Sequence, residues 1–468
     1  MMTELSAEFE KNMKDLIGEE EFLLLKASYS EEPVSALRIN LLKKVPEDAA
    51  DLGGIFGLEK LSFSDNGFLY SPETCPGRRP FHDAGAYYIQ DPSAMIPGLL
   101  LTELLDERYG EEKDLKILDL CAAPGGKTTR IAEWMKGRGI LFSNEINRGR
   151  ADILSSNVER MGIDNAIVLN ESPRMLSERF AGYFDAVIVD APCSGEGMFR
   201  KDPGAVEEWS PENVRLCAER QEEILEHAYL MLRPGGIMVY STCTFERCEN
   251  EDRILALLSG HPDMNLIDAR DIKAKIPGAS DGLEGCTGAV RLWPMHFNGE
   301  GHFAAALAKS GDAERTLPFG GFEPSSSVKD KKALSVFCAD SLSESAAAYI
   351  LGASDRYKMF GDTLSIMPYE TPSLKGLRVV RCGLKAGVFK KDRFEPDHAL
   401  ALFLSEDDVK NFRRVTEDEG ESFVKGMTLD GEGKGWCLVS VCGYSLGWGK
   451  AAGGRIKNHY PRGLRIPG

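Results

Sequence analysis

The chain has 468 residues, 43% of them apolar, and its formal net charge is −17. This length exceeds one ordinary domain, so we expect more than one hydrophobic core. The first residues are polar and acidic, and no apolar run approaches the roughly 20 residues that a membrane helix needs. We therefore expect neither a secretory signal nor a membrane anchor, and we expect the protein in the cytoplasm.

The acidic balance argues against a nucleic-acid partner, because Lys and Arg contacts dominate phosphate binding. A local basic surface is sufficient, however. The stretch from Val439 to Gly468 holds five Lys or Arg and no Asp or Glu. A solvated basic tail and an RNA-binding surface both remain open for this stretch.

Eleven cysteines are scattered from Cys75 to Cys442. An odd number without dense spacing does not suit a disulfide scaffold, so we expect reduced thiols. No CxxC pair occurs, and no thiol or histidine pairs stand at zinc-ligand spacing. The sequence therefore predicts no metal site.

Residues 1–80 read as a small mixed segment. Apolar positions predict helices around residues 9–17 and 22–25, and alternation predicts a strand at 36–42. A turn-rich patch at 71–80 suggests a boundary near residue 80.

Residues 81–310 alternate short apolar runs with longer helical stretches. Helices are predicted from about Thr128, from about Arg148 and up to Leu232–Gly235. This alternation predicts an α/β fold, a doubly wound parallel sheet that binds ligands at the carboxyl ends of its strands. The predicted strands are 116–120, 139–143, 166–169, 186–190 and 236–240.

Residues 311–374 begin rich in Ser, Lys and Asp and predict a linker entering an intermediate domain. Residues 375–468 predict a compact β-rich module with strands such as 377–381 and 436–441. The chain thus divides into 1–80, 81–310, 311–374 and 375–468.

A glycine turn follows the first strand of the predicted sheet, and it reads CAAPGGK from Cys121 to Lys127. Small residues let backbone N–H groups approach a ligand, and the next helix begins there. GxGxxG and GxxxxGK[ST] are both absent, which disfavours a pyrophosphate or triphosphate ligand. We expect the ligand-binding turn to comprise Cys121, Ala122, Ala123, Pro124, Gly125, Gly126 and Lys127.

Two acidic residues end later strands. Glu145 is placed to accept both hydroxyls of a ribose, although a surface acid at a helix start is about equally compatible with its position. Asp190 precedes Ala191 and Pro192, where a turn former would also fit. Its place at the carboxyl edge favours a functional role.

Cysteines follow the fourth and fifth strands. Cys193 lies in DAPCSG and Cys243 in YSTCTF. Neighbouring parallel strands lie about 5 Å apart, so both thiols can face one pocket. A single cysteine is more often an inert apolar residue, but two in this placement indicate reactivity.

The motifs LDLCAAPGGKTT, SNE, DAPCSGEGMFRKDP, LRPGGIMVYSTCTF and ENE resemble the Nop/Sun family of RNA cytosine-C5 methyltransferases. ALRIN near residue 36, GAYYIQDPSAM near 85 and GEGHFAAAL near 300 extend the likeness. The ending GWGKAAGGRIKNHYPRGLR resembles the PUA-like RNA-binding tail of the bacterial ribosomal small-subunit methyltransferase F group. The resemblance implies a class I methyltransferase fold that uses S-adenosyl-L-methionine, with a small N-terminal α/β segment and a C-terminal β-rich PUA-like domain.

The resemblance also implies roles for the cysteines. Cytosine C5 is a weak nucleophile, so a thiolate first adds to C6, and a base later removes the C5 proton before the thiolate leaves. The family assigns the attack to Cys243 and assistance in product release to Cys193, whereas DNA cytosine-C5 methyltransferases use the Pro-Cys cysteine as nucleophile.

The remaining roles follow from the same resemblance. Residues 121–127 would line the methionine portion of the cofactor and Glu145 its ribose. Asp190 would lie between cofactor and cytosine. The family often has an aspartate after the third strand to hold adenine; this chain has Asn170, which could still offer hydrogen bonds.

An RNA substrate requires cations near the site and on the flanking domains, including the N-terminal segment. Arg200 and Lys201 follow the Cys193 loop and could meet a phosphate, or they could solvate a loop. The tail mixes cations with a ring suited to stacking, and its candidate RNA contacts are Lys450, Arg455, Lys457, Tyr460 and Arg462.

The group resemblance points to 16S rRNA as the substrate. Transfer RNA methylation and a non-catalytic ribosome-assembly factor that binds RNA remain alternatives. We expect a monomer, with RNA as the partner and neither membrane nor metal.

Overall fold

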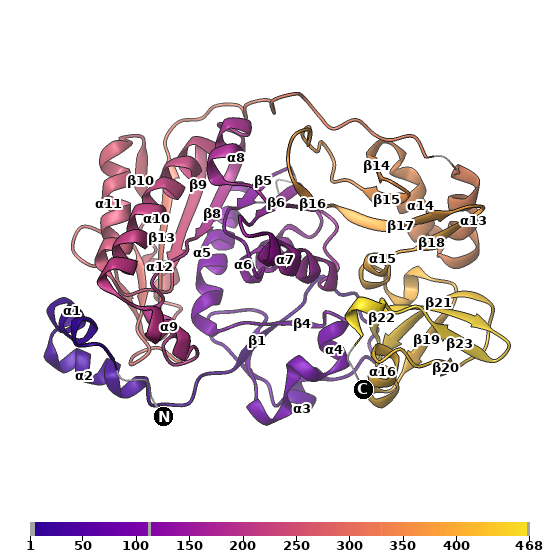
Figure 1. Ribbon diagram of the computed structural model, residues 1–468, viewed down its shortest axis with the longest axis horizontal. Coiled ribbons are helices and arrows are strands. Elements are labelled where there is room, and N and C mark those ends of the chain that lie inside the picture. Colours follow the sequence, from indigo (N-terminus) through magenta and orange to yellow (C-terminus); the bar gives the residue numbers. More distant parts are fainter. Residues whose placement is uncertain (1–4, 111–113, 329, 466–468) are drawn as a thin grey trace.

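The computed structural model describes residues 5–110, 114–328 and 330–465. Figure 1 places a central sheet between two N-terminal helices at lower left and the orange and yellow C-terminal units at right. The N-terminal helices are α1 (Ala7–Ile17) and α2 (Glu19–Ser28). Within the described ranges, no helix is long and apolar enough to cross a membrane.

A small antiparallel sheet follows these helices, with strand order β2-β3-β1-β4. Strand β4 pairs with β1, so this unit continues to Ile89 and the boundary predicted near residue 80 is wrong. The turn-rich patch at 71–80 is a loop inside the unit. Its elements are β1 (Ala36–Ile39), α3 (Leu52–Phe56), β2 (Glu59–Lys60), β3 (Gly67–Leu69), η1 (Pro72–Thr74), η2 (Pro76–Arg78), α4 (Pro80–Asp83) and β4 (Tyr87–Ile89).

The central sheet has the order β11-β12-β13-β9-β8-β5-β6-β7-β16, with β10 paired to β13. Strands β9, β8, β5, β6 and β7 run parallel, which confirms the predicted doubly wound fold. The parallel strands are β5 (Lys116–Asp119), β6 (Ile140–Asn144), β7 (Ala166–Leu169), β8 (Phe184–Asp190) and β9 (Leu232–Thr242). Residues 232–235 belong to β9, because Leu232 already pairs with Phe184; the helix predicted to include them ends at Met231.

Antiparallel strands extend one side of this sheet. Strand β13 runs antiparallel to β9, and β12 pairs with β13. These strands are β10 (Met264–Leu266), β11 (Ala279–Asp281), β12 (Val290–Leu292) and β13 (His302–Lys309).

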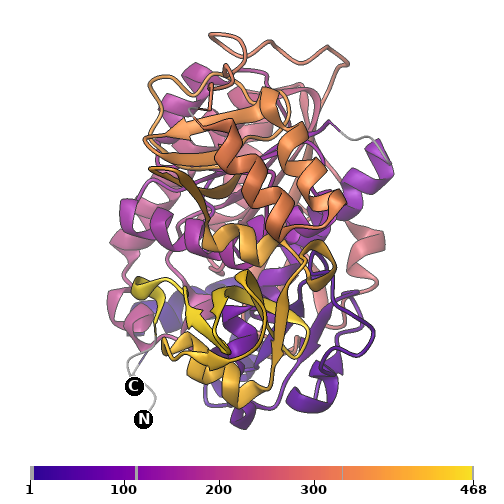
Figure 2. The same ribbon diagram turned by 90° about the vertical axis from the view of Figure 1, so that its right-hand side faces the viewer.

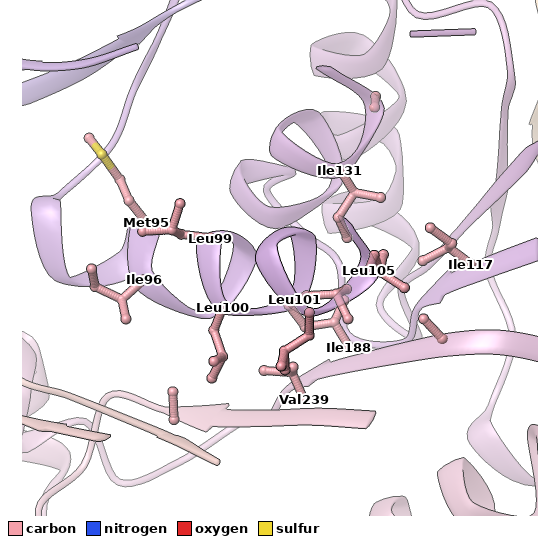
Figure 3. Packing of buried hydrophobic residues seen from close by; sticks show 14 of the residues in the cluster. Met95, Ile96, Leu99, Leu100, Leu101, Leu105, Ile117, Ile131, Ile188 and Val239 are labelled. Carbon is pink, nitrogen blue, oxygen red and sulfur yellow. The ribbon is translucent and has the colours of Figure 1, made fainter. Parts of the chain in front are cut away.

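Helices cover both faces of the sheet because alternate strand residues point to opposite sides. Ile117 and Ile188 pack on one face with α5, α6 and α7, and Figure 3 shows the α5 side chains Leu100 and Leu101 against Val239. The other face packs on α8, α10 and α11. The helices of this domain are α5 (Pro92–Tyr109), α6 (Gly126–Met135), α7 (Arg148–Arg160), α8 (Pro173–Arg179), η3 (Glu196–Met198), α9 (Pro203–Glu208), α10 (Pro211–Met231), η4 (Arg247–Glu249), α11 (Glu251–Gly260) and α12 (Arg270–Lys273).

The predicted boundary at residue 374 divides an intermediate unit whose sheet has the order β14-β15-β17-β18. Residues 375–403 therefore do not belong to the last module, and β16 joins neither C-terminal sheet but pairs with β7 at the edge of the central sheet. The elements are α13 (Lys331–Ser341), α14 (Glu344–Gly352), η5 (Ser354–Arg356), β14 (Tyr357–Phe360), β15 (Thr363–Ile366), β16 (Val379–Cys382), β17 (Leu384–Lys390), β18 (Arg393–Pro396) and α15 (His398–Phe403).

The chain crosses between these sheets at one residue. Gly383 separates β16 from β17 and has a φ of +62°, and a Cβ there would lie 2.1 Å from the carbonyl oxygen of Ile366. Only glycine fits this crossing point.

The last unit is a curled sheet with the order β19-β21-β22-β23-β20. Figures 1 and 2 both show it, in yellow, below the orange intermediate unit. Its inner face shares a core with the N-terminal unit, where Phe81 packs edge-on against Tyr444. Its elements are η6 (Glu406–Asp408), β19 (Phe412–Val415), α16 (Glu417–Val424), β20 (Leu429–Asp430), β21 (Gly435–Val441), β22 (Tyr444–Ala452), β23 (Arg455–Asn458) and η7 (Arg462–Leu464).

Candidate active site

A cavity of about 650 Å³ opens at the carboxyl ends of the parallel strands. Residues that follow β5, β6, β8 and β9 meet in its wall, as the strand directions require. Its lining includes Cys121, Ala123, Glu145, Ile146, Pro173, Asp190, Cys193 and Cys243.

The glycine turn forms one wall of this cavity. Of the predicted turn residues, Cys121 and Ala123 line the cavity, whereas its lining does not include Ala122, Pro124, Gly125, Gly126 or Lys127. A Cβ on Gly126 would lie 2.7 Å from the side-chain nitrogen of Gln90, so a larger residue there would have to displace the Gln90 amide.

The N-terminal unit fixes the same turn through Arg38. Its Nη2 atom donates to the carbonyl oxygen of Gly126 at 3.0 Å, and its Nη1 atom lies 2.6 Å from a carboxylate oxygen of Glu133. Both charged side chains are buried. The ALRIN strand therefore positions the turn that opens α6.

Glu145 lies in the cavity wall at the end of β6. Its Oε1 atom accepts the backbone N–H of Asn147 at 2.8 Å, and its Oε2 atom lies 3.4 Å from Nη1 of Arg150. Asn147 caps α7 by accepting from the N–H of Arg150. The strand-to-helix turn thus holds the carboxylate at the cavity.

Asn170 is not among the residues that line this cavity, and its contact with adenine stays a prediction. Its side-chain nitrogen donates to the carbonyl oxygens of Glu145 and Ile146, at 2.8 Å each. The amide is therefore occupied in supporting the Glu145 turn. Ser172, Pro173 and Arg174 form the wall beyond it.

Asp190 sits at the centre of a polar cluster. Its Oδ2 atom lies 2.5 Å from Nζ of Lys127, and its Oδ1 atom accepts from the hydroxyl of Ser241 at 2.7 Å. Burial alone would raise the pKa of Asp190, but the Lys127 ammonium, with His302 beside it, holds this pKa well below its usual range. Asp190 is therefore a permanent carboxylate.

His302 is a member of this cluster to which the sequence assigned no role. Its Nε2 atom lies 3.7 Å from Oδ1 of Asp190 and has no hydrogen-bond partner among the described residues. Burial lowers the pKa of His302. His302 stands in the GEGHF motif, but the sequence alone does not reveal that β13 places it near Asp190 at the end of β8.

The two predicted cysteines meet at the end of the cavity. The sulfur atoms of Cys193 and Cys243 lie 3.2 Å apart without a disulfide bond, and the N–H of Cys243 donates to the Cys193 sulfur at 3.3 Å. The hydrogen bond with Cys243, together with burial, raises the pKa of Cys193 well above its ordinary value. Cys193 therefore keeps its proton beside the second sulfur.

Buried carboxyl groups hold the loop that carries Cys193. Glu249 accepts from the hydroxyl of Ser194 and, at 2.7 Å, from the side chain of Gln221. Burial raises the pKa of Glu249 to about 7. Gly197 contacts the strand beside it so closely that a Cβ would lie 2.8 Å from the carbonyl oxygen of Cys243.

The two cations that follow this loop form ion pairs with carboxylates of the protein. Arg200 is buried, with its Nε atom 3.0 Å from Glu300. Lys201 is half-buried, with its Nζ atom 2.6 Å from Asp91. Because Arg200 is buried against Glu300, it is not available to a phosphate, whereas the phosphate contact of partly exposed Lys201 stays a prediction.

The C-terminal unit presents four of its predicted RNA contacts at the surface: Lys450, Arg455, Lys457 and Arg462. Tyr460 is only 3% exposed and packs against Phe423 and His398, so its predicted role in base stacking is wrong. Trp436 lies half-buried on β21 instead, with Nζ of Lys450 5.2 Å from its ring centre.

No group of three or more His, Cys, Asp or Glu suited to a metal ion occurs within residues 5–110, 114–328 and 330–465.

Family models match most of the chain. The model of 16S rRNA methyltransferase RsmB/F matches residues 105–308, and the N-terminal domain of 16S rRNA methyltransferase RsmF matches residues 5–92. The RsmF rRNA methyltransferase first C-terminal domain matches residues 337–404, and the methyltransferase RsmF PUA domain matches residues 410–466.

Two solved structures share the fold of the catalytic region. A methyltransferase homologue from Pyrococcus horikoshii is 25% identical with a TM-score of 0.53, over 65% of this chain and 95% of that one. NSun6 from Pyrococcus horikoshii is 21% identical with a TM-score of 0.55, over 66% and 99%.

Full-length relatives are more similar in sequence. The ribosomal RNA small subunit methyltransferase F of Escherichia coli O127:H6 is 32% identical over 92% of this chain and 90% of its own length. The protein of that name from Shewanella loihica is 30% identical over 97% and 93%. The chain therefore belongs to the RsmB/F family of 16S rRNA methyltransferases, and to its RsmF branch.

Proposed function

We propose that the protein methylates carbon 5 of cytosine in 16S rRNA, with S-adenosyl-L-methionine as methyl donor and Cys243 as the covalent nucleophile. The observation that carries this proposal is the pair of sulfur atoms of Cys193 and Cys243, 3.2 Å apart at the end of the cavity. Neither acyl transfer nor phosphoryl transfer requires two adjacent thiols of this kind.

The cavity fits the donor. The Glu145 carboxylate can accept from both ribose hydroxyls, and Ile146 and Pro173 offer apolar surface to an adenine ring. When bound, S-adenosyl-L-methionine supplies an electrophilic methyl group on a sulfonium sulfur. Cys121 and Ala123 would face its methionine portion.

The residues at the far end suit the pyrimidine. The Cys243 thiolate adds to C6, and electron density moves toward N3 of the ring. Asp190, held ionised by Lys127, would stabilise a proton at the N3 edge. Without a proton at N3, the ring would carry the full negative charge of the added thiolate, and the addition to C6 would be less favourable.

Product release regenerates the aromatic ring. A solvent base takes the C5 proton, the C5–H electron pair forms the C5–C6 double bond, and the electron pair of the C6–sulfur bond goes to the Cys243 sulfur as that bond breaks. Cys193 keeps its proton beside the departing sulfur, so it can protonate that sulfur as the bond breaks. This division of labour makes Cys243 the nucleophile and Cys193 the residue that assists release.

The target base must leave its stack before a thiolate can approach C6. The outer face of the C-terminal sheet suits the flanking RNA, because Trp436, Lys450 and Lys457 stand opposite one another on β21, β22 and β23. We assign RNA contacts to Lys450, Arg455, Lys457 and Arg462, with Trp436 as the stacking ring. Such an enzyme would act as a cytoplasmic monomer.

The test compares the native protein with Cys193→Ala and Cys243→Ala, each incubated with 16S rRNA and S-adenosyl-L-methionine. Denaturing gels detect a protein–RNA adduct, and mass spectrometry of nucleosides detects 5-methylcytosine. We expect product from the native protein, a trapped adduct with Cys193→Ala, and neither with Cys243→Ala.

Transfer RNA is the comparison substrate in the same experiment. Product on transfer RNA alone would reassign the substrate and keep the mechanism. An adduct trapped by Cys243→Ala would reverse the two cysteine roles. Binding of 16S rRNA without methylation would leave a non-catalytic RNA-binding factor.

A further inference from the structure

A second cavity, of about 460 Å³, lies at the opposite edge of the central sheet. Its walls include Lys136 and Gly137, which precede β6, and Gly162 to Asn165, which precede β7. Parallel strands start at one edge and end at the other, so this cavity is separated from the cysteines by the length of the strands.

Three units of the fold meet around this cavity. The segment after β1 contributes Leu41 to Lys44, and the intermediate unit contributes residues of α14 and α15. Tyr349 and Phe403 of those helices stack with ring centres 5.4 Å apart, which makes that wall rigid.

Lys43, Lys44 and Lys136 line the cavity, which we call the lysine cavity. No carboxylate lies within ion-pair distance of any of the three across the described residues. An ammonium has three donors. The Lys43 ammonium donates to the carbonyl oxygen of Leu402 at 2.5 Å, and its other donors have no protein acceptor in the part of the chain that the structure describes.

The acids of the lysine cavity are already engaged by the protein. Asp164 accepts from the hydroxyl of Tyr349 at 2.7 Å, and Asp408 accepts from the N–H and the hydroxyl of Ser405 at 2.9 and 2.7 Å. Burial raises the pKa of Asp164. Both acids of the lysine cavity thus have partners within the protein, whereas Lys44 and Lys136 have no carboxylate partner among the described residues.

Lys43 is partly buried and, in the described part of the chain, has no counter-ion, which is costly because part of its hydration is lost. Burial, with the nearby Arg160, lowers the pKa of Lys43 to about 7. A phosphate oxygen beside Lys43 would accept hydrogen bonds from its free N–H groups and would favour the charged ammonium. The chain as a whole has a formal net charge of −17. A polyanion therefore has to bind where lysines are locally in excess, as they are in this cavity.

We infer that the lysine cavity binds phosphates of the RNA substrate, at the sheet edge opposite the catalytic cysteines. This inference rests on the proposed function for the identity of the polyanion. The ligand is the phosphodiester backbone rather than a base, because the lysines offer point charges without a fixed hydrogen-bonding pattern. The substrate then touches three units of the protein at a place remote from the target cytosine.

The test uses the full chain and 16S rRNA in filter binding over a series of KCl concentrations. The variant Lys44→Ala/Lys136→Asn removes the exposed lysines. Asparagine suits position 136 because its φ is +50°, a conformation that asparagine tolerates. The matched control, Lys331→Ala/Lys332→Ala, removes two exposed lysines from α13 and the same charge.

Each phosphate contact contributes about 0.7 to the slope of log Kd against log salt for single-stranded nucleic acid, so two lost contacts lower that slope by about 1.4. We expect this decrease in the cavity variant and the native slope in the control. Native slope and affinity in the cavity variant would overturn the inference, as would an equal decrease in both variants.

The outcome is separable from that of the proposed function. A native protein that methylates 16S rRNA while the cavity variant binds RNA unchanged would overturn the lysine cavity alone. A native protein that binds RNA without methylating it would overturn the catalytic proposal, and the salt slopes would still decide the cavity.

Discussion

The Lys127 ammonium lies 2.5 Å from Oδ2 of Asp190, so the turn that begins α6 supplies the counter-ion for the end of β8. Methionine in place of Lys127 removes the strongest influence that lowers the pKa of Asp190, so this pKa rises. Because the proposed mechanism uses the ionised Asp190 carboxylate, we expect the rate of Lys127→Met, as the pH is lowered, to fall at a higher pH than the native rate. The measurement is methylation rate against pH.

Lys127→Arg is the control for this profile, since it keeps the positive charge. An acid limb that is the same in Lys127→Met and the native protein would show that Lys127 does not set the ionisation of Asp190.

Thiol reactivity tests the coupling of the two cysteines. Since the hydrogen bond with Cys243 is the largest cause of the raised pKa of Cys193, Cys243→Ala lowers that pKa and Cys193 becomes alkylated at lower pH. Iodoacetamide labelling at a series of pH values, read by peptide mass spectrometry, follows each thiol. Exposed Cys75 serves as the internal reference; unchanged labelling of Cys193 would contradict the coupling.

Glu145→Ala weakens donor binding. Hydrogen bonds to a charged group contribute about 1.5–3 kcal/mol, so we expect the Kd for S-adenosyl-L-methionine to rise about 10- to 100-fold. Calorimetric titration measures it. Glu145→Gln keeps one acceptor and loses less, and Asp152→Asn on the exposed face of α7 has the native Kd; a native Kd in Glu145→Ala would remove the ribose role.

Arg38→Met destabilises the protein. It leaves buried Glu133 without its cation, which costs about 3–5 kcal/mol in free energy of unfolding. Urea denaturation compares it with Arg78→Met, an exposed arginine for which we expect the native stability. Equal stability of the two variants would mean that the Arg38 pair contributes nothing.

Substitutions on the C-terminal unit distinguish two aromatic rings. Trp436→Ala removes the ring beneath Lys450 and weakens RNA binding by about 1–3 kcal/mol. Tyr460→Phe keeps the buried ring packed on Phe423 and leaves RNA affinity at its native value. The reverse result in filter binding would place an RNA contact on the Tyr460 hydroxyl and none on the Trp436 ring.

The local sequence pattern predicted the parallel strands and the residues that meet at their carboxyl ends. Apolar runs located the parallel strands, and a polar residue at each strand end then had to face the same edge, which brought Glu145, Asp190 and both cysteines together. The resemblance supplied their chemistry, which spacing alone leaves open.

What the sequence could not predict depends on contacts between segments far apart in the chain. Arg200 reads as a loop cation, but Glu300, a hundred positions later, buries and neutralises it. Tyr460 reads as a tail aromatic, but the curl of the last sheet turns it inward against His398. Residues 379–382 were predicted to belong to the last module, but they form β16 at the edge of the central sheet. The local sequence does not reveal which sheet an edge strand joins.

That edge strand also determines how the chain can be shortened. Without β16, the whole length of β7 would present unpaired backbone N–H and C=O groups at the margin of a sheet made of apolar strands. A fragment ending after β13 would keep every catalytic side chain and yet offer this margin to neighbouring molecules, so it would aggregate. We therefore expect a soluble fragment of the methyltransferase domain to require the segment up to Cys382, which pairs with β7.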